Sequence, residues 1–369
     1  MIYLDNGATS LRKPPEVARA VVRAMARCAN PGRGGYGAAM EAAQQVYRCR
    51  EAAARLFHCD AEQVVFTSNC THGLNIAIRS LVRPGDRVVI SGFEHNAVTR
   101  TLHDIGAETI IAGRRLFDRE DTLRSFEAAL KNKPKAAVFT HVSNVFGYIL
   151  PVPELARLCR EYAVPFILDA AQSAGTLEVN MAALGAQFIA MPGHKGLLGP
   201  QGTGLLLCAG ESKPLICGGT GTESVSQAMP EYLPERLEAG TVNVPGIAGL
   251  EAGLRFLLRT GTETVFRREH RQLEAAADGL EKLGVRCFRG RHQAGTLSFL
   301  TEHDCEETAE FLAQEGIAVR AGLHCAPLAH ESAGTLETGT VRVSFGIDAD
   351  DRQTRALLGA VSKLLLRKN

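Results

Sequence analysis

Short apolar runs alternate with amphipathic segments over roughly the first 210 residues, and this alternation constrains the fold more than any other feature. The runs are typical of buried strands, and the segments between them have the spacing of helices that cover a sheet. Repeating βα units build a mostly parallel sheet. We therefore expect an α/β fold with a seven-stranded sheet, its strands at 64–67, 87–90, 109–111, 136–140, 164–168, 186–191 and 203–208.

The pattern changes after a loop-rich span at 217–245, where a helix over 247–259 indicates a connector. A chain of 369 residues is long enough for a large domain with a smaller one appended. We expect three parts: an N-terminal segment that joins the small domain, a large ligand-binding domain, and a small C-terminal α+β domain, at 1–15, 16–250 and 251–369.

An acid and a lysine follow two successive strands of the predicted sheet. The apolar run 164–168 leads to Asp169, and the run 188–191 leads to Lys195. Ligands of open α/β sheets bind at this carboxyl edge. Pyridoxal phosphate (PLP) needs an amine to condense with its aldehyde and a carboxylate to keep its ring nitrogen protonated. The pair predicts a PLP enzyme, although either residue alone is more often a turn former or a surface charge.

Other polar residues follow strand ends and extend this hypothesis. The turn at 67–71 opens a helix whose N-terminus suits a phosphate, but it also fits an ordinary helix cap. His95 can stack on a pyridine ring or move protons, and Asn144 can donate its amide to a ring oxygen or a carboxylate. Arg342, in an alternating strand, has the planar fork that clamps an α-carboxylate. Each has a structural alternative: a buried histidine, a turn or a solvated strand face.

Cys325 lies in a glycine-containing loop beside His324, and a flexible segment is expected at 331–340. A cysteine on a mobile loop near positive groups can become a reactive thiolate, whereas buried cysteines are inert. The dipeptide alone proves nothing, because His58-Cys59 repeats it at the end of a helix. Metal ligation is the alternative, but no second pair at zinc spacing accompanies it, so we predict no metal site.

The bulk composition excludes several classes of protein. Lys and Arg number 41 against 40 Asp and Glu, a formal net charge of +1, so no basic field favours nucleic-acid binding. No apolar run approaches the length of a membrane span, and the first residues lack the features of a signal peptide. The ten cysteines lack a CxxC pair and indicate free thiols in a reducing compartment. We expect a soluble, cytoplasmic protein.

Taken together and in order, several motifs resemble one family. They are Tyr3 to Thr9, the turn at 67–75, Glu94-His95, Ser143-Asn144-Val145, Asp169-Ala170-Ala171-Gln172, Gly193-His194-Lys195, Glu238-Ala239-Gly240-Thr241, His324-Cys325-Ala326 and Arg342. The chain resembles fold-type I PLP enzymes of aminotransferase class V, specifically the cysteine desulfurases and selenocysteine lyases of the sulfur-mobilisation type.

The resemblance implies a role for each matching residue. Lys195 would form the Schiff base, and Asp169 would hold the pyridine nitrogen. Gln172 would contact the phenolic oxygen, and His95 would stack on the ring. Residues near the phosphate would be Asn69, Cys70, Thr71 and His194, and Thr241 would complete the phosphate site of the neighbouring subunit of a homodimer. Asn144 and Arg342 would hold the substrate carboxylate, Cys325 would take the sulfur, and Arg33 and Arg320 would support the site.

The chain departs from the family pattern at four positions. Pro192 and Cys70 stand where hydroxyl residues are common near the phosphate, and Leu323 and Tyr36 stand where histidine is common. We expect a PLP enzyme that converts L-cysteine to L-alanine and leaves a persulfide on Cys325 for an acceptor protein. The alternatives are lyase activity on L-selenocysteine or cysteine sulfinate, another class V reaction, a binding protein without catalysis, and a thiol hydrolase that uses His324 and Cys325.

Overall fold

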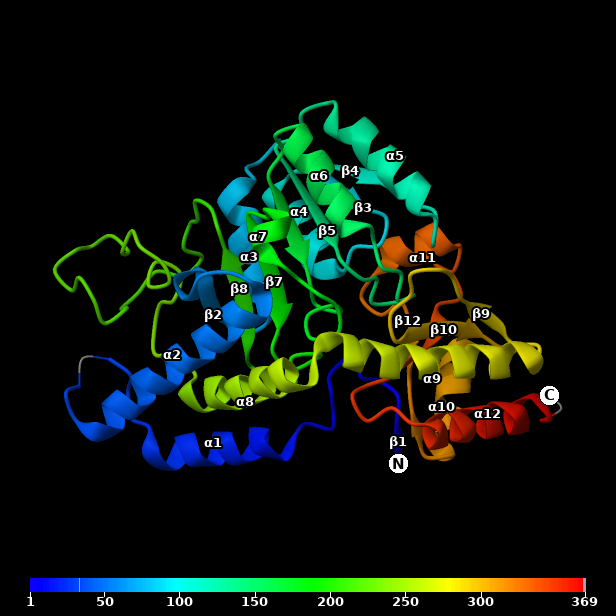
Figure 1. Cartoon of the computed structure of the whole chain (residues 1–369). Helices are drawn as coiled ribbons and strands as arrows, with labels where there is room; N and C mark the ends of the chain where they lie inside the picture. Colours follow the sequence, from blue (N-terminus) through cyan, green and yellow to red (C-terminus); the bar gives the residue numbers. More distant parts are fainter. Residues whose placement is uncertain (33, 368–369) are drawn as a thin grey trace.

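A computed structural model describes residues 1–32 and 34–367. Its large sheet has seven strands in the order β2-β8-β7-β6-β5-β3-β4 (Figure 1). Strands β3 to β7 pair in parallel, and β8 is antiparallel to both of its neighbours. The expected α/β fold with a mostly parallel sheet is confirmed. The strands are β2 (Val64–Thr67), β3 (Arg87–Ser91), β4 (Glu108–Ala112), β5 (Ala136–Thr140), β6 (Phe166–Asp169), β7 (Phe188–Pro192) and β8 (Gly204–Cys208).

Helices cover both faces of this sheet, because its strands are apolar on both sides. On one face Val88 and Ile90 pack with α3 (Cys70–Leu81) and α4 (Asn96–Ile105). On the other, Val89 belongs to a cluster shared with five further helices of this part. Those helices are α2 (Gly37–Phe57), α5 (Arg119–Leu130), α6 (Val152–Glu161), α7 (Met181–Leu184) and α8 (Val244–Thr260), and α1 (Pro15–Arg27) packs against α8.

A second sheet of four strands, in the order β12-β13-β10-β9, forms the other half of the molecule (Figure 1). Its core joins the sheet to helices through residues such as Leu273, Phe299 and Leu357. The strands are β9 (Arg286–Phe288), β10 (Thr296–Leu300), β12 (Arg320–Gly322) and β13 (Thr340–Ser344), and the helices are α9 (Thr262–Lys282), α10 (Cys305–Gln314), α11 (Pro327–Ala333) and α12 (Asp351–Leu365).

The start of the chain lies against this second half. Strand β1 (Ile2–Tyr3) pairs in parallel with β11 (Ile317–Ala318), and the backbone of Asp5 bridges to Ser344. The N-terminal segment therefore reaches the junction between the two sheets. The exact domain boundaries stay a prediction.

The expectation of a flexible segment at 331–340 is wrong for its first residues. Residues Pro327–Ala333 form helix α11, which begins with a proline in its first turn and ends at Gly334 in the left-handed conformation. The His330 ring nitrogen Nδ1 then bonds the hydroxyl of Thr335 at 2.8 Å. Sequence reasoning read the glycines as flexibility, whereas here Gly334 ends a helix.

No helix within 1–32 and 34–367 combines the length and the apolar character that a membrane crossing needs.

Candidate active site

A cavity of about 110 Å³ lies at the carboxyl ends of the large sheet's strands. It gathers nine of the side chains singled out from the sequence, together with Pro192. The nine are Asn69, Cys70, Thr71, His95, Asn144, Asp169, Gln172, His194 and Lys195. Parallel strands explain the convergence, because β3, β5, β6 and β7 all end at one edge.

Asp169 is the last residue of β6 and is almost fully buried. Its Oδ1 accepts a hydrogen bond from the backbone N–H of Ala171 at 2.9 Å and from the thiol of Cys70 at 3.5 Å. Burial and the Asp169 charge raise the pKa of Cys70 well above its usual value, so this thiol stays protonated and donates. The Cys70 side chain is therefore directed to Asp169.

Lys195 lies just beyond the end of β7 and lines two cavities, the one above and a second beside it. Burial lowers the pKa of this amine, and the nearby Arg342 guanidinium lowers it further. Gly193 belongs here because a Cβ at that position would collide with the Thr203 hydroxyl. A lysine with a lowered pKa has a larger neutral fraction, which is the form that attacks carbonyl groups.

His95 follows β3 and caps helix α4. Its Nδ1 accepts a hydrogen bond from the backbone N–H of Ala97 at 3.0 Å, so the proton of the neutral ring is on Nε2. Burial lowers the pKa of His95, which favours that neutral form. This hydrogen bond at Nδ1 fixes the orientation of the imidazole ring, which lines the cavity.

The other end of the cavity is built on the N-terminus of α3. The Asn69 side chain caps this helix by accepting from the N–H of His72 at 2.8 Å, and the first N–H groups of any helix lack intrahelical acceptors. His194 bonds the Thr9 hydroxyl through Nδ1 at 3.1 Å, and burial lowers the pKa of His194 to about 4. Pro192 lines the same cavity and offers no hydroxyl. Neutral donors at a helix N-terminus suit an anion.

Gln172 and Asn144 both make contacts with backbone carbonyl groups. The Gln172 amide donates to the carbonyl of Gly7 at 3.0 Å. The Asn144 amide donates to the carbonyl of His324 at 2.8 Å. Asn144 therefore links the cavity wall to the segment that carries Cys325.

Arg342 is 2% exposed and lies in β13 of the small sheet. Its two terminal nitrogens donate to Asp5 Oδ1 at 2.7 Å and to the carbonyl of Asn144 at 2.9 Å. The remaining Nε is buried and has no hydrogen-bond partner among the described residues. Asp5 thus orients a guanidinium whose charge reaches Lys195.

Cys325 is exposed, in contrast to the buried His324 before it. Both residues have left-handed backbone, with φ of 50° and 57°, which is uncommon for residues with a side chain. Two hydrogen bonds tie the carbonyl groups of this turn to the large sheet's loops: Asn144 to the His324 carbonyl, and the Asn96 N–H to the Cys325 carbonyl at 2.8 Å. Burial lowers the pKa of His324 to about 2, so His324 is not a cationic partner for the thiol.

Four of the predicted site residues that the structure describes do not line this cavity: Cys325, Arg342, Thr241 and Arg320. Thr241 borders a separate cavity of about 240 Å³, beside Ser68 and His72. Arg320 is exposed on β12, directly across the ladder from Arg342. Arg33 lies outside the described residues. Within the described ranges, no three His, Cys, Asp or Glu side chains gather where a metal ion could bind.

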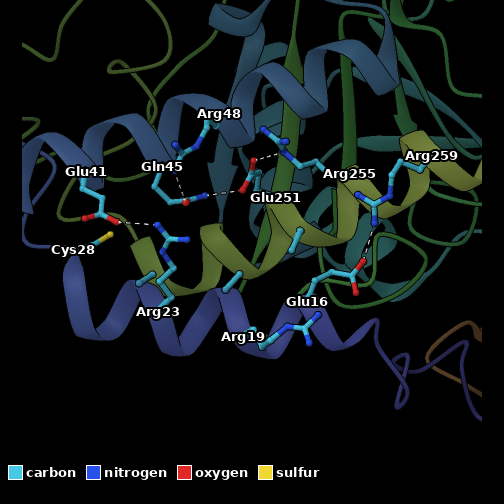
Figure 2. Close-up of a pocket in the computed structure, with 13 residues that line it drawn as sticks. Glu16, Arg19, Arg23, Cys28, Glu41, Gln45, Arg48, Glu251, Arg255 and Arg259 are labelled. Atoms are coloured by element: carbon cyan, nitrogen blue, oxygen red, sulfur yellow. Dashed lines mark hydrogen bonds and ion pairs between the residues drawn. The ribbon is translucent and has the colours of Figure 1, made fainter.

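A wider groove of about 670 Å³ runs between α1, α2 and α8 (Figure 2). Some of its arginines pair with carboxylates, such as Arg259 with Glu16 at 2.8 Å and Arg255 with Glu251 at 2.5 Å. Neither Lys195 nor Asp169 lines it. The groove is a charged surface without the groups that the predicted chemistry needs.

Sequence reasoning gave no role to Asp5, Glu94 or Asn96, although each supports the site. Asp5 pairs with Arg342, Asn96 holds the Cys325 turn through its backbone, and Glu94 is fully buried beside His95. Asp5 and Glu94 both belong to motifs named in the sequence analysis, Tyr3 to Thr9 and Glu94-His95. Their position in these motifs could have indicated that the two acids support the site. The Asn96 contact is made by backbone and leaves no trace in residue type.

Comparisons with known proteins agree on one family. The aminotransferase class-V model matches residues 2–357. A probable cysteine desulfurase of Methanothermobacter thermautotrophicus is 33% identical, over 93% of this chain and 90% of that protein. One from Pyrococcus abyssi is 31% identical, over 99% and 94%. The solved apo structure of cysteine desulfurase from Thermococcus onnurineus NA1 has a TM-score of 0.88 and 31% identity, over 98% of this chain and 94% of that one.

Proposed function

The chain belongs to the aminotransferase class-V family, and we propose that it is a PLP-dependent cysteine desulfurase that converts L-cysteine to L-alanine. The observation that carries the proposal is the shared cavity of Lys195, Asp169 and His95, whose wall residue Asn144 holds the turn that carries Cys325. The family resemblance drawn from the sequence is confirmed.

The residues of the cavity fit the cofactor. They offer an amine, a buried carboxylate, a flat neutral imidazole and the N-terminus of a helix, which match an aldehyde, a ring nitrogen, a ring face and a phosphate. We infer that Lys195 holds PLP, Asp169 its ring nitrogen, His95 its ring face and Gln172 its phenolic oxygen. Asn69, Cys70 and Thr71 would hold the phosphate through the start of α3, together with His194. Bound PLP supplies an electron sink for bond breaking at the amino acid's Cα.

Each residue then has a separate task in the proposed reaction. Lys195, with its lowered pKa, takes the proton from the substrate's Cα. Arg342 and Asn144, with support from Arg320 and Arg33, hold the substrate carboxylate. The Cys325 thiolate attacks the substrate sulfur, so that an S–S bond forms while the C–S bond breaks. The substrate Cβ keeps the electron pair and takes up a proton, which yields alanine and a persulfide on Cys325.

The exposure of Cys325 supports transfer of this sulfur to an acceptor protein. The position of Thr241, in a different cavity from Lys195, supports a homodimer in which Thr241 serves the phosphate of the partner's site. In such a dimer each site would be incomplete without the second copy.

The test is to incubate the purified holoenzyme with L-cysteine and to measure alanine together with sulfur on the protein. We expect equal amounts of alanine and of persulfide on Cys325 in a single turnover. The variant Lys195→Ala should lose at least about 10²-fold in rate, because it lacks its proton-transfer group. Cys325→Ala should form no persulfide, with Cys217→Ala as the control at another exposed cysteine. Turnover of selenocysteine but not cysteine, or full activity of Cys325→Ala, would contradict the proposal.

A further inference from the structure

Glu94 is a fully buried carboxyl group in the short loop between β3 and α4. Its Oε1 accepts hydrogen bonds from the hydroxyl of Ser91 and from the backbone N–H of Thr140, the latter at 2.9 Å. Its Oε2 is buried and has no hydrogen-bond partner among the described residues. The contacts of this side chain are thus concentrated on one oxygen.

The surroundings of Glu94 favour its neutral form. Neither carboxyl oxygen has a charged hydrogen-bond partner among the described residues, and a buried carboxylate without one is costly. The charged group whose field reaches Glu94 is Asp169, an acid, and the nearby rings of His95 and His141 have pKa values lowered by burial. Burial raises the pKa of Glu94 to about 8, against the opposing effect of the hydrogen bonds from Ser91 and Thr140, and the Asp169 charge raises it further.

Glu94 joins the ends of two strands of the large sheet. Ser91 is the last residue of β3 and Thr140 the last residue of β5. The loop after β3 leads to His95 and Asn96, and the loop after β5 leads to Asn144. β3 and β5 are paired up to Ile90 and Val138, and Glu94 extends this connection beyond the ladder to the roots of the two loops.

The same two loops hold the Cys325 turn. The Asn96 N–H donates to the Cys325 carbonyl, and the Asn144 amide donates to the His324 carbonyl, both at 2.8 Å. These bonds restrain two residues in left-handed backbone, which would otherwise relax. A shift of either loop would move the carbonyl that it holds.

We propose that Glu94 is a positioning residue, which as a neutral carboxylic acid keeps His95 and the Cys325 turn in register for sulfur transfer. The proposal rests on the function proposed above. Glu94 does not touch the reacting atoms. It acts through the Ser91 and Thr140 contacts, and both are lost when the carboxyl group is removed.

Ionisation of Glu94 would add a second negative charge in the buried region near Asp169. The loop would then relax to bring the carboxylate toward water, and the turn would lose its alignment. This loss sets in as the pH rises through about 8, the pKa of the buried group. A neutral amide of the same shape cannot ionise and would not show it.

The experiment compares holoenzyme with Glu94, Glu94→Gln and Glu94→Ala. Alanine formation and the rate of iodoacetamide labelling at Cys325, read by peptide mass spectrometry, are followed from about pH 6 to pH 10. At neutral pH we expect Glu94→Gln to stay close to wild type and Glu94→Ala to lose about tenfold in alanine formation, the effect of an unmade buried hydrogen bond. Above pH 8 the ratio of Glu94→Gln to wild type should rise for alanine formation, and the labelling rates should diverge.

Two further variants keep the test decisive. Ser91→Ala removes the hydroxyl that donates to Glu94 and should lower alanine formation in the same direction if Glu94→Ala does not fold. Glu337→Gln, an exposed acid, is the control and should leave both readouts unchanged. Equal losses in Glu94→Gln and Glu94→Ala at neutral pH, or matching alkaline profiles for wild type and Glu94→Gln, would overturn the proposal. If wild type forms no alanine, the proposed function fails, while the labelling of Cys325 still tests the role of Glu94.

Discussion

Arg342 and Asp5 form an ion pair, with 2.7 Å between Nη2 and Oδ1, that joins the small sheet to the first residues of the chain. The guanidinium is buried, whereas the carboxylate keeps 19% of its side-chain surface. The pair sets the direction of the arginine fork that we assign to the substrate carboxylate. Through this pair the first residues of the chain support a site whose other residues come from strands much later in the sequence.

Replacing Asp5 by Asn should weaken both substrate binding and the fold. The change leaves the Arg342 charge buried without its carboxylate, and loss of the partly exposed partner of a buried charge costs about 2 kcal/mol. We expect the KM for cysteine to rise more than kcat falls. Denaturant unfolding and steady-state kinetics measure the two effects, with Glu337→Gln as the surface control. An unchanged KM would show that Asp5 does not orient Arg342.

The Cys70 thiol should matter through Asp169. Cys70→Ala removes the donor to Asp169 Oδ1, and a hydrogen bond from a thiol, a weak donor, contributes about 1 kcal/mol. We expect PLP affinity to fall about fivefold, the equivalent of that energy, and Cys70→Ser to retain most of it. Titration of apoenzyme with PLP gives the affinities. A larger loss in Cys70→Ser than in Cys70→Ala would contradict this role.

Glu269 predicts how stability changes with pH. This buried carboxyl on α9 lines a small cavity that Lys195 also lines, and burial raises its pKa to about 8, with Asp348 adding to the effect. The unfolded chain releases this proton near its ordinary pKa, so the native state loses stability as pH rises from about 4.5 to 8, by about 1.4 kcal/mol per unit at most.

The variant Glu269→Gln should show a shallower decline of unfolding free energy over that pH range than wild type does. Chemical denaturation at several pH values measures it. Glu263→Gln changes an exposed acid on the same helix and should keep the wild-type slope. Parallel slopes for wild type and Glu269→Gln would mean that Glu269 is ionised in the native protein.

Residues that follow the ends of strands could be placed in the site from the sequence. Features set by backbone conformation or by main-chain contacts could not. Asp169 and Lys195 could be placed together because each follows an apolar run, and the ends of parallel strands share an edge. The left-handed turn at His324 and Cys325 could not, since neither residue type indicates that backbone. The Asn96 contact to Cys325 joins segments far apart in the chain and uses only main-chain atoms.

The hydrogen-bond partners of Cys70 and Asn144 could not be predicted from the sequence, because each side chain has more than one possible partner. Cys70 was expected near the phosphate by analogy with threonine, yet its thiol is directed to Asp169 because the first turn of α3 lies beside the end of β6. Asn144 was assigned to a substrate carboxylate, and its amide holds the His324 carbonyl. The packing of neighbouring segments, rather than residue type, selects the partner in both cases.

The most direct measurement is borohydride reduction of the holoenzyme followed by peptide mapping. Reduction makes the linkage between protein and PLP permanent, so the modified lysine can be identified by mass spectrometry. We predict a single pyridoxyl adduct, on Lys195, and none in Lys195→Ala. An adduct on another lysine, or protein that binds no PLP, would contradict the account.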